Sequence, residues 1–192
     1  DGITSLSTST SGTSNFIAGV NAGNSITSGG NYNVVVGDEA GTAITTGDNN
    51  TLIGMNAGDA LTSGDNNVAV GRNSLTSDTL GDRNVAVGAA ALYAQNFTSS
   101  TDSYNTAVGY SAGISVTTGT NNTLIGGLAG DAITTGGSNA SVGKTSLSAN
   151  TTGSANAAFG ADALGSNTTA SNNTAVGTNS LNANTTGSEN VA

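Results

Sequence analysis

Several residue types that usually carry protein chemistry are absent from this chain of 192 residues. It contains no cysteine, histidine, proline or tryptophan. Without histidine and cysteine, the usual zinc sites and the Ser-His and Cys-His catalytic pairs cannot form. The composition therefore predicts no metal site of that kind, no cofactor and no enzymatic activity.

Positive charge is also scarce. Lys and Arg number 3 against 12 Asp and Glu, which gives a formal net charge of −9. Nucleic-acid binding requires clusters of basic side chains, so we expect no nucleic-acid partner. The chain also has no apolar run near the roughly 20 residues of a membrane span, so we expect no membrane insertion.

A repeat of 17 residues organises what is present, anchored on an Asn with a Gly four residues later. The first row has 18 residues, and the row from Asn84 has 21 because of an insertion within 93–104. We therefore treat 1–192 as a single repeat domain. The rows begin at Asn15, Asn33, Asn50, Asn67, Asn84, Asn105, Asn122, Asn139, Asn156, Asn173 and Asn190.

Each row carries a short segment such as "NTAVG" or "NTLIG", which is rich in β-branched residues and bounded by turn residues. Such segments are typical of strands. A fixed period this short indicates a solenoid, in which stacked coils bury a core jointly. The sequence predicts an all-β fold, a parallel β-solenoid (β-roll) of about eleven 17-residue coils, stacked about 4.8 Å apart.

Two positions of the row are nearly invariant. Column one is Asn, and we predict that its stacked amides form hydrogen bonds from coil to coil; the simpler alternative is that Asn suits a turn. Column five is Gly, which indicates a positive φ or no room for a Cβ. The predicted structural ladder comprises Asn15, Asn33, Asn50, Asn67, Asn84, Asn105, Asn122, Asn139, Asn156 and Asn173, with Gly37, Gly54, Gly71, Gly88, Gly109, Gly126, Gly143, Gly160 and Gly177.

The two columns between Asn and Gly are both apolar. We predict that column four forms a hydrophobic spine inside the coil: Ala18, Val36, Ile53, Val70, Val87, Val108, Ile125, Val142, Phe159 and Val176. Column three then points outward, because strand side chains alternate, although it too is apolar in nearly every row. A strand that is apolar on both faces is usually covered on both. We therefore predict that another copy of the chain covers column three.

Columns nine and twelve compensate for each other. Rows with Gly at column nine have an apolar column twelve, as in Gly41 with Ile44, whereas rows with Leu have a polar one, as in Leu75 with Asp78. A core of fixed volume at native packing density favours this exchange.

The segment "GGSNASVGKTS" (136–146) ends like a phosphate-binding loop, in Gly143-Lys144-Thr145. However, the upstream spacing is wrong for that signature, and no helix former follows to supply amide donors. Gly143 is the column-five Gly of its row, and Lys144 lies in a variable column that we expect to face solvent.

Rows such as "NTAVGYSAGISVTTGTNNTLIGG" resemble the repeats of trimeric autotransporter adhesin heads and of longer arrays in bacterial surface proteins and bacteriophage tail fibres. This resemblance implies a left-handed coil, a homotrimer, and a structural role in an extracellular fibre, at the cell surface or on a virion. It also implies a cell-surface receptor or glycan as the kind of ligand bound.

The insertion is the candidate contact loop, because it interrupts the repeat and carries Tyr93, Phe97 and Tyr104. The alternative is a tolerated loop without a role.

Two other functions stay open. Column thirteen suits an ice-binding array of Thr: Thr27, Thr45, Thr62, Thr79, Thr117, Thr134, Thr151, Thr168 and Thr185. Thr is equally a good strand residue. Carboxylate pairs could support glycoside cleavage, but Asp38 and Glu39 are adjacent and would point to opposite sides of an extended segment.

Both ends of the sequence fit inside a row. If the row begun at Asn190 continues at residue 1, then Gly2 falls on column five, Leu6 on column nine and Thr10 on the Thr column. This pattern predicts either a window of a longer array or subunits that stack head to tail into a filament.

Overall fold

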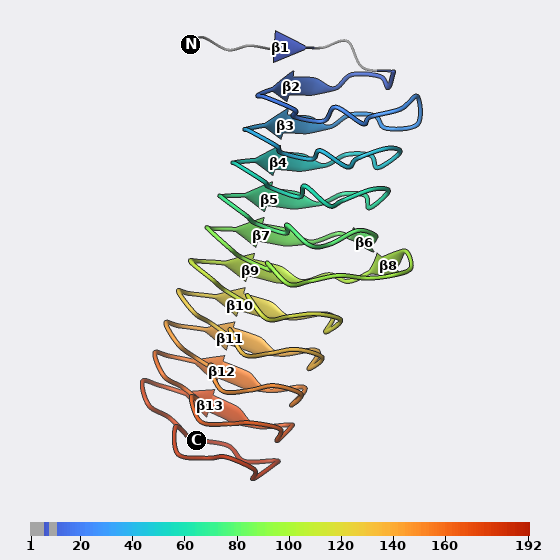
Figure 1. The fold of residues 1–192 in the computed structure, drawn as a ribbon. Coiled ribbons are helices and arrows are strands. Elements are labelled where there is room, and N and C mark those ends of the chain that lie inside the picture. The colour runs from blue at the N-terminus through green and yellow to red at the C-terminus, as the bar shows by residue number, and fades with distance from the viewer. Residues whose placement is uncertain (1–5, 8–10) are drawn as a thin grey trace.

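The computed structural model describes residues 6–7 and 11–192, and that part of the chain consists of strands and turns without a helix (Figure 1). Most strands are only three residues long. The strands are β1 (Leu6–Ser7), β2 (Phe16–Ala18), β3 (Val34–Val36), β4 (Thr51–Ile53), β5 (Val68–Val70), β6 (Gly81–Asp82), β7 (Val85–Val87), β8 (Thr101–Asp102), β9 (Thr106–Val108), β10 (Thr123–Ile125), β11 (Ala140–Val142), β12 (Ala157–Phe159) and β13 (Thr174–Val176).

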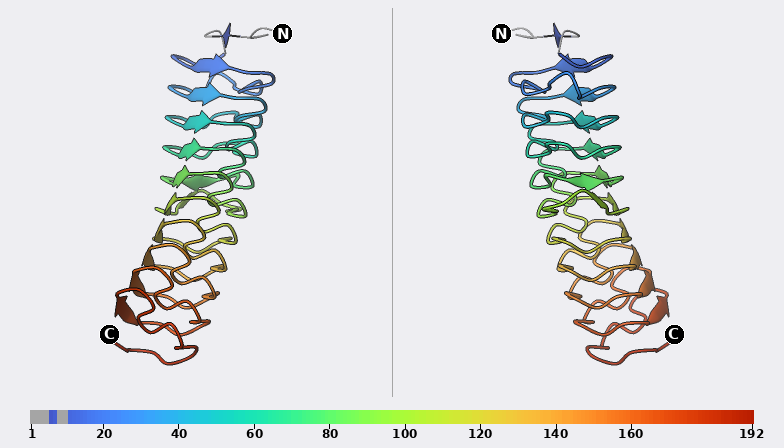
Figure 2. Two further views of the ribbon diagram at one scale, coloured as in Figure 1. Left: turned by 90° about the vertical axis from the view of Figure 1, so that its left-hand side faces the viewer. Right: turned by 90° about the vertical axis from the view of Figure 1, so that its right-hand side faces the viewer.

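One sheet runs the length of the molecule and is parallel from β2 to β13, which confirms the predicted β-solenoid. Its strand order is β1-β2-β3-β4-β5-β7-β9-β10-β11-β12-β13, and β6 and β8 form a separate two-stranded sheet. From β3 onward the register between neighbours follows the repeat, as in Thr123 opposite Ala140. Two side views show the coils stacked as a rod, with the N- and C-terminal coils at opposite ends (Figure 2).

The turns number about nine, fewer than the eleven coils expected, because the outermost rows do not form full turns. The row from Asn190 contributes one isolated bridge, Thr174 with Val191. At the other end, β1 pairs antiparallel with β2, so the placement of Leu6 in column nine of a parallel coil is wrong. Gly2 and Thr10 lie outside the described residues.

The predicted faces of the strands are reversed. Column three lies inside the coil: Val35, Leu52, Ala86 and Leu124 are fully buried. Column four, expected as the inner spine, points outward, and Ile125 is 39% exposed. Our prediction that a partner covers column three is therefore wrong, because the chain's own opposite wall covers it.

That opposite wall explains why small residues suffice at column three. Column eight is buried and mostly Ala, as at Ala40 and Ala57, and column nine or column twelve adds one large aliphatic group per coil. Leu75 fills this space from column nine in the left-handed conformation, with φ of 51°, whereas Ile44 fills it from column twelve beside Gly41. The predicted compensation thus corresponds to two ways of filling the same narrow interior.

Left-handed residues also turn the corners of the coil. Columns seven and seventeen have positive φ in every complete 17-residue row, as at Asn56 (56°) and Asn66 (59°). Asn tolerates this conformation better than most residues, which accounts for its frequency there. The repeat therefore encodes both the strand and the turns that close the coil.

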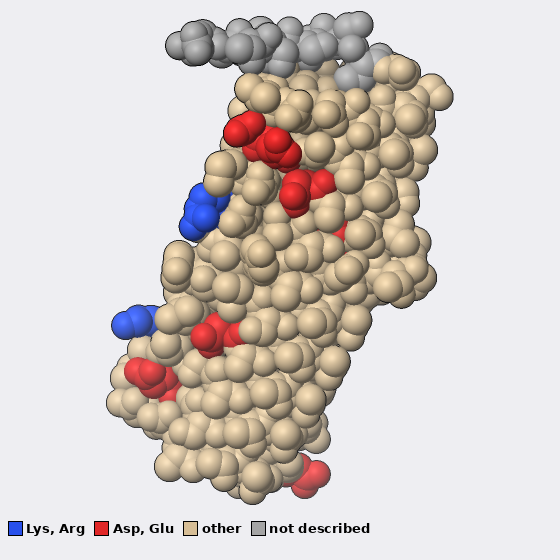
Figure 3. All heavy atoms as spheres, in the orientation of Figure 1, with Lys and Arg blue, Asp and Glu red and all other residues tan. Residues whose placement is uncertain are grey.

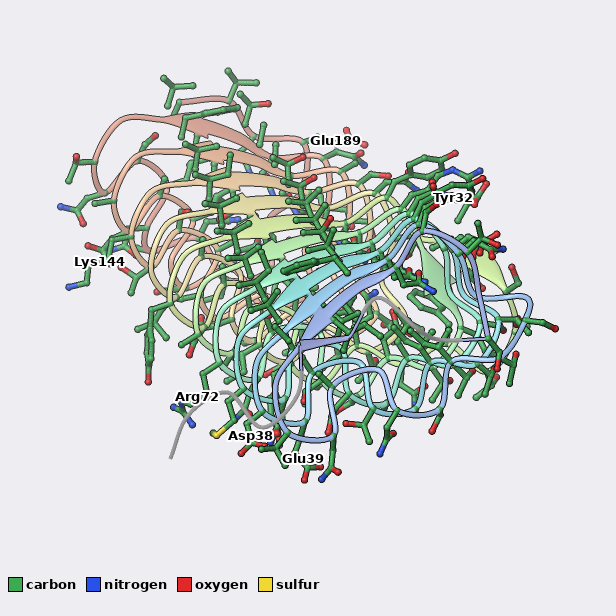
Figure 4. The ribbon with its side chains drawn as sticks, turned by 90° about the horizontal axis from the view of Figure 1, so that it is seen from above. Tyr32, Asp38, Glu39, Arg72, Lys144 and Glu189 are labelled. Carbon is green, nitrogen blue, oxygen red and sulfur yellow. The ribbon has the colours of Figure 1, made fainter. Side chains whose placement is uncertain are left out.

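Charged groups are sparse on the surface. On the side shown in Figure 3, the acidic side chains lie in small separate groups with uncharged surface between them. Viewed along the rod, Asp38, Arg72 and Lys144 of column six project outward from the coil (Figure 4). Column six therefore faces solvent, as the variability of its residues indicates.

Candidate interaction surface

The outward side of the parallel sheet, formed by columns two and four, extends over ten strands. We call this surface the outer sheet face. Sixteen of its twenty residues are apolar, four are Thr, and none is charged. It comprises Phe16, Ala18, Val34, Val36, Thr51, Ile53, Val68, Val70, Val85, Val87, Thr106, Val108, Thr123, Ile125, Ala140, Val142, Ala157, Phe159, Thr174 and Val176.

Register aligns these side chains from strand to strand in two rows. Val68 lies opposite Val85 and Val70 opposite Val87, and the same alignment continues through β9 and β10. Parallel pairing sets a step of about 4.8 Å between coils, so both rows have a fixed spacing. Chemically, such a face can bury apolar side chains against a matching surface, but it offers no acid, base or nucleophile.

The column-one Asn side chains do not belong to this surface, because they are buried and bonded within the stack. The backbone N–H of Asn67 donates to Oδ1 of Asn50 at 2.9 Å, and Nδ2 of Asn67 donates to the carbonyl of Gly81 at 2.9 Å. The pattern recurs at Asn50, Asn122 and Asn156. Most of these Asn side chains thus link one coil to the next and close a corner of their own coil, whereas Nδ2 of Asn173 has no hydrogen-bond partner.

Column thirteen also bonds within the stack. The hydroxyl of Thr45 donates to the carbonyl of Thr62 at 3.2 Å, and that of Thr134 to the carbonyl of Thr151 at 3.1 Å. Comparable bonds are made by Thr27, Thr62, Thr117, Thr151 and Thr168. These hydroxyls have already used their only donor inside the rod, which weakens the case for an outward ice-binding array.

The segment that resembles a phosphate loop has a different role in the structure. Lys144 is exposed, and the hydroxyl of Thr145 donates to the carboxylate of Asp162 in the next coil. Turns follow instead of a helix, so no helix N-terminus is available for an anion. The adjacent carboxylate would repel a phosphate.

The insertion is only partly exposed. Tyr93 and Tyr104 are accessible, but Phe97 is just 6% exposed and cannot contribute to a contact surface in this conformation. The Phe97 carbonyl accepts a hydrogen bond from Thr79 at 2.9 Å. Arg83 forms an ion pair with Asp102 and lies 5.8 Å from the ring centre of Tyr104. The structure therefore anchors the loop on the previous coil.

A series of buried polar side chains, joined by hydrogen bonds, lies beside the insertion. Nδ2 of Asn105 donates to Oε1 of Gln95 at 2.8 Å, and Nε2 of Gln95 donates to Oδ2 of Asp78 at 2.6 Å. Oδ1 of Asp78 accepts the backbone N–H groups of Gly81 and Phe97 at 3.1 and 3.2 Å. Sequence reasoning placed Asp78 in a polar column but missed Gln95, because the insertion obscures the alignment of that row.

Burial raises the pKa of Asp78 above its usual 3.8, although the hydrogen bonds from Gln95, Phe97 and Gly81 act in the opposite direction. A carboxyl whose pKa is raised on folding binds its proton more tightly in the native state. Its contribution to the free energy of unfolding is therefore fully present below the pKa of this carboxyl in the unfolded chain. That contribution is lost as the pH rises through the native pKa.

We expect Asp78→Asn to remove this pH-dependent component. Between pH 3 and 7, the stability of the variant relative to the wild type should increase as the pH rises. Urea denaturation across that range measures the difference, with Asp38→Asn on the exposed surface as the matched control. A difference that stays constant, or that decreases toward neutral pH, would show that Asp78 does not titrate as its burial implies.

Comparison with protein-family models, curated proteins and solved structures found no match. Within residues 6–7 and 11–192, no helix could span a membrane, and no three Asp, Glu, His or Cys side chains form a group suited to a metal ion. The outer sheet face is the candidate interaction surface.

Proposed function

We propose that this chain is a non-enzymatic structural rod within an extracellular fibre, such as a phage tail fibre or a bacterial surface filament or adhesin. The observation that carries the proposal is the bonding between coils, which continues around the whole perimeter. The resemblance of the rows to adhesin and tail-fibre repeats supports the same role.

The junction between the coils that contain β3 and β4 illustrates this bonding. On the strand side, the N–H of Val34 donates to the carbonyl of Asn50 at 2.8 Å. On the opposite wall, the N–H of Thr45 donates to the carbonyl of Thr62 at 2.8 Å. At a corner, the N–H of Asp48 donates to Oδ1 of Asp65 at 2.7 Å. These bonds lie side by side, so a load along the rod is shared among them.

Such a rod extends a fibre by about 4.8 Å per coil, and its backbone amides are largely engaged. A protease must bind an extended, unpaired segment, and a surface with few such segments resists cleavage. Resistance of this kind suits a protein outside the cell, where proteases and detergents are common.

Immunogold labelling tests the proposed location directly. An antibody raised against this chain should decorate fibres on intact cells or on virus particles of the source organism. Labelling restricted to the cytosol in sectioned cells would contradict the proposal. The antibody must first bind the folded chain in solution, which separates a masked epitope from an absent one.

Ice binding is the alternative function, through the column-thirteen Thr residues. The hydrogen bonds that these hydroxyls donate within the rod speak against it. Measurement of thermal hysteresis separates the two functions, since a structural rod should leave the freezing point unaffected even at high protein concentration.

A further inference from the structure

The outer sheet face is apolar along its whole length, and its side chains range from half-buried to exposed in the single chain. Ile53, Ile125 and Phe159 in its column-four row are 37%, 39% and 42% exposed. Soluble proteins rarely expose a continuous apolar surface of several hundred Å² unless it binds something. The chemistry and geometry of the face restrict what can cover it.

Charge favours a copy of the chain over a partner of opposite charge. The chain has a formal net charge of −9, yet none of its acidic or basic residues lies on the outer sheet face. Two such faces can therefore meet without placing like charges in contact. A basic partner would find no acidic residues on this face with which to pair.

The spacing of the rows leads to the same occupant. Ridges of side chains, mostly Val, Ile and Thr, recur about 4.8 Å apart over ten strands. A partner can fit its side chains between these ridges along the full length only if it has the same period. A second copy has that period by construction, and stacked sheets pack face to face about 10 Å apart.

The area of the face sets a further condition. Nine steps of about 4.8 Å and strands about 10 Å long give roughly 450 Å² of projected area per chain, or about 900 Å² for a pair. Stable specific interfaces bury at least about 1,000 Å² of accessible surface. The accessible surface of a ridged face is larger than its projected area. A short partner would bury too little, whereas a second rod of equal length can cover the whole face.

We propose that the outer sheet face is a self-association surface, and that it packs against the same face of a second copy to form a two-chain rod. The two sheets then enclose a layer of Val, Ile, Thr and Phe side chains between the two solenoids. A face that meets its own copy is the isologous arrangement expected of a two-fold dimer. This inference goes beyond the proposed fibre function and does not depend on it.

Light scattering coupled to size exclusion tests the proposal on the whole chain. The wild type should have twice the chain mass of 18.3 kDa. Ile125→Lys places an unpaired charge in the interface twice per dimer, and we expect dimer affinity to fall by about 100-fold or more. Thr135→Lys, in the same coil but on the exposed opposite wall, is the matched control and should remain dimeric.

Thr123→Lys provides a second interface variant, because its exposed, polar position tolerates a lysine without strain on the fold. Circular dichroism verifies that each variant is folded. The proposal is overturned if the wild type is monomeric, if it is a trimer, or if dimers persist in both folded interface variants. It is also overturned if Thr135→Lys dissociates as readily as the interface variants do.

Discussion

Leu124→Asp should destabilise the fold severely, whereas Ile125→Asp one residue later should leave it largely intact. Leu124 is fully buried and Ile125 is 39% exposed. The Leu124 side chain occupies the space beside two column-nine glycines, since a Cβ added at Gly113 or Gly130 would lie 2.6 or 2.8 Å from its methyl groups. The aspartate would remove this packing and bury a charge without a partner.

The expected loss is large because two costs add. Truncation of a buried Leu typically costs 2–5 kcal/mol, and an unpaired buried carboxylate adds several more. We expect the melting temperature of Leu124→Asp to fall by about 10 °C or more, and that of Ile125→Asp by only a few degrees. Circular dichroism during heating measures both.

Both variants should be diluted until light scattering detects single chains, so that loss of association does not contribute to the difference. Equal melting temperatures would contradict the assignment of column three to the interior. Greater damage from Ile125→Asp would support the opposite assignment, with column four inside.

The period, the strands and the parallel stack could be predicted from the sequence because they depend on columns that hardly vary. The inward face could not be assigned from apolar character, since columns three and four are both apolar. Column four is apolar in every row, which favoured the assignment of column four to the interior. The interior is in fact too narrow for bulk at column three when column nine already contributes a Leu.

Residue size at column three contained the missing signal. Where column nine is Gly, column three is often large, as in Ile17, Val35, Leu52 and Leu124. Where column nine is Leu, column three is always Ala or Ser, as in Ala69 and Ser141. Column four shows no such dependence. Only residues that share one interior volume need to compensate in size, which places column three inside and column four outside.

The candidate surface was harder to predict for a related reason. An exposed row of Val and Ile is indistinguishable in sequence from a buried one, so the outer sheet face became visible only once the interior was assigned. The polar chain from Asn105 through Gln95 to Asp78 joins residues 10 and 17 positions apart across an irregular row. A fixed 17-residue alignment places Asp78 and Gln95 in the same column, but it does not show the contact between Gln95 and Asn105.

Gly126→Ala should destabilise the rod strongly, whereas Gly127→Ala should not, although the two glycines are adjacent. Gly126 has φ of +134°, which residues with a Cβ rarely adopt. A Cβ at Gly126 would also lie 2.5 Å from the carbonyl oxygen of Gly143 in the next coil, whereas one at Gly127 would meet nothing within 4 Å.

The two coils cannot move apart to relieve the contact at Gly126, because hydrogen bonds join them on both sides of it. The N–H of Gly143 donates to the carbonyl of Ile125 at 2.8 Å, and that of Thr145 to the carbonyl of Gly127 at 3.1 Å. Backbone strain of this kind costs about 1–3 kcal/mol, and the clash adds to it, so we expect the free energy of unfolding to fall by about 3 kcal/mol or more.

Gly127 occupies the outward column that holds Arg72 and Lys144 in other coils, and alanine there should be neutral or stabilise by up to about 1 kcal/mol. Urea denaturation of both variants measures the difference, and similar midpoints would mean that the column-five glycines are not required by the close approach of neighbouring coils.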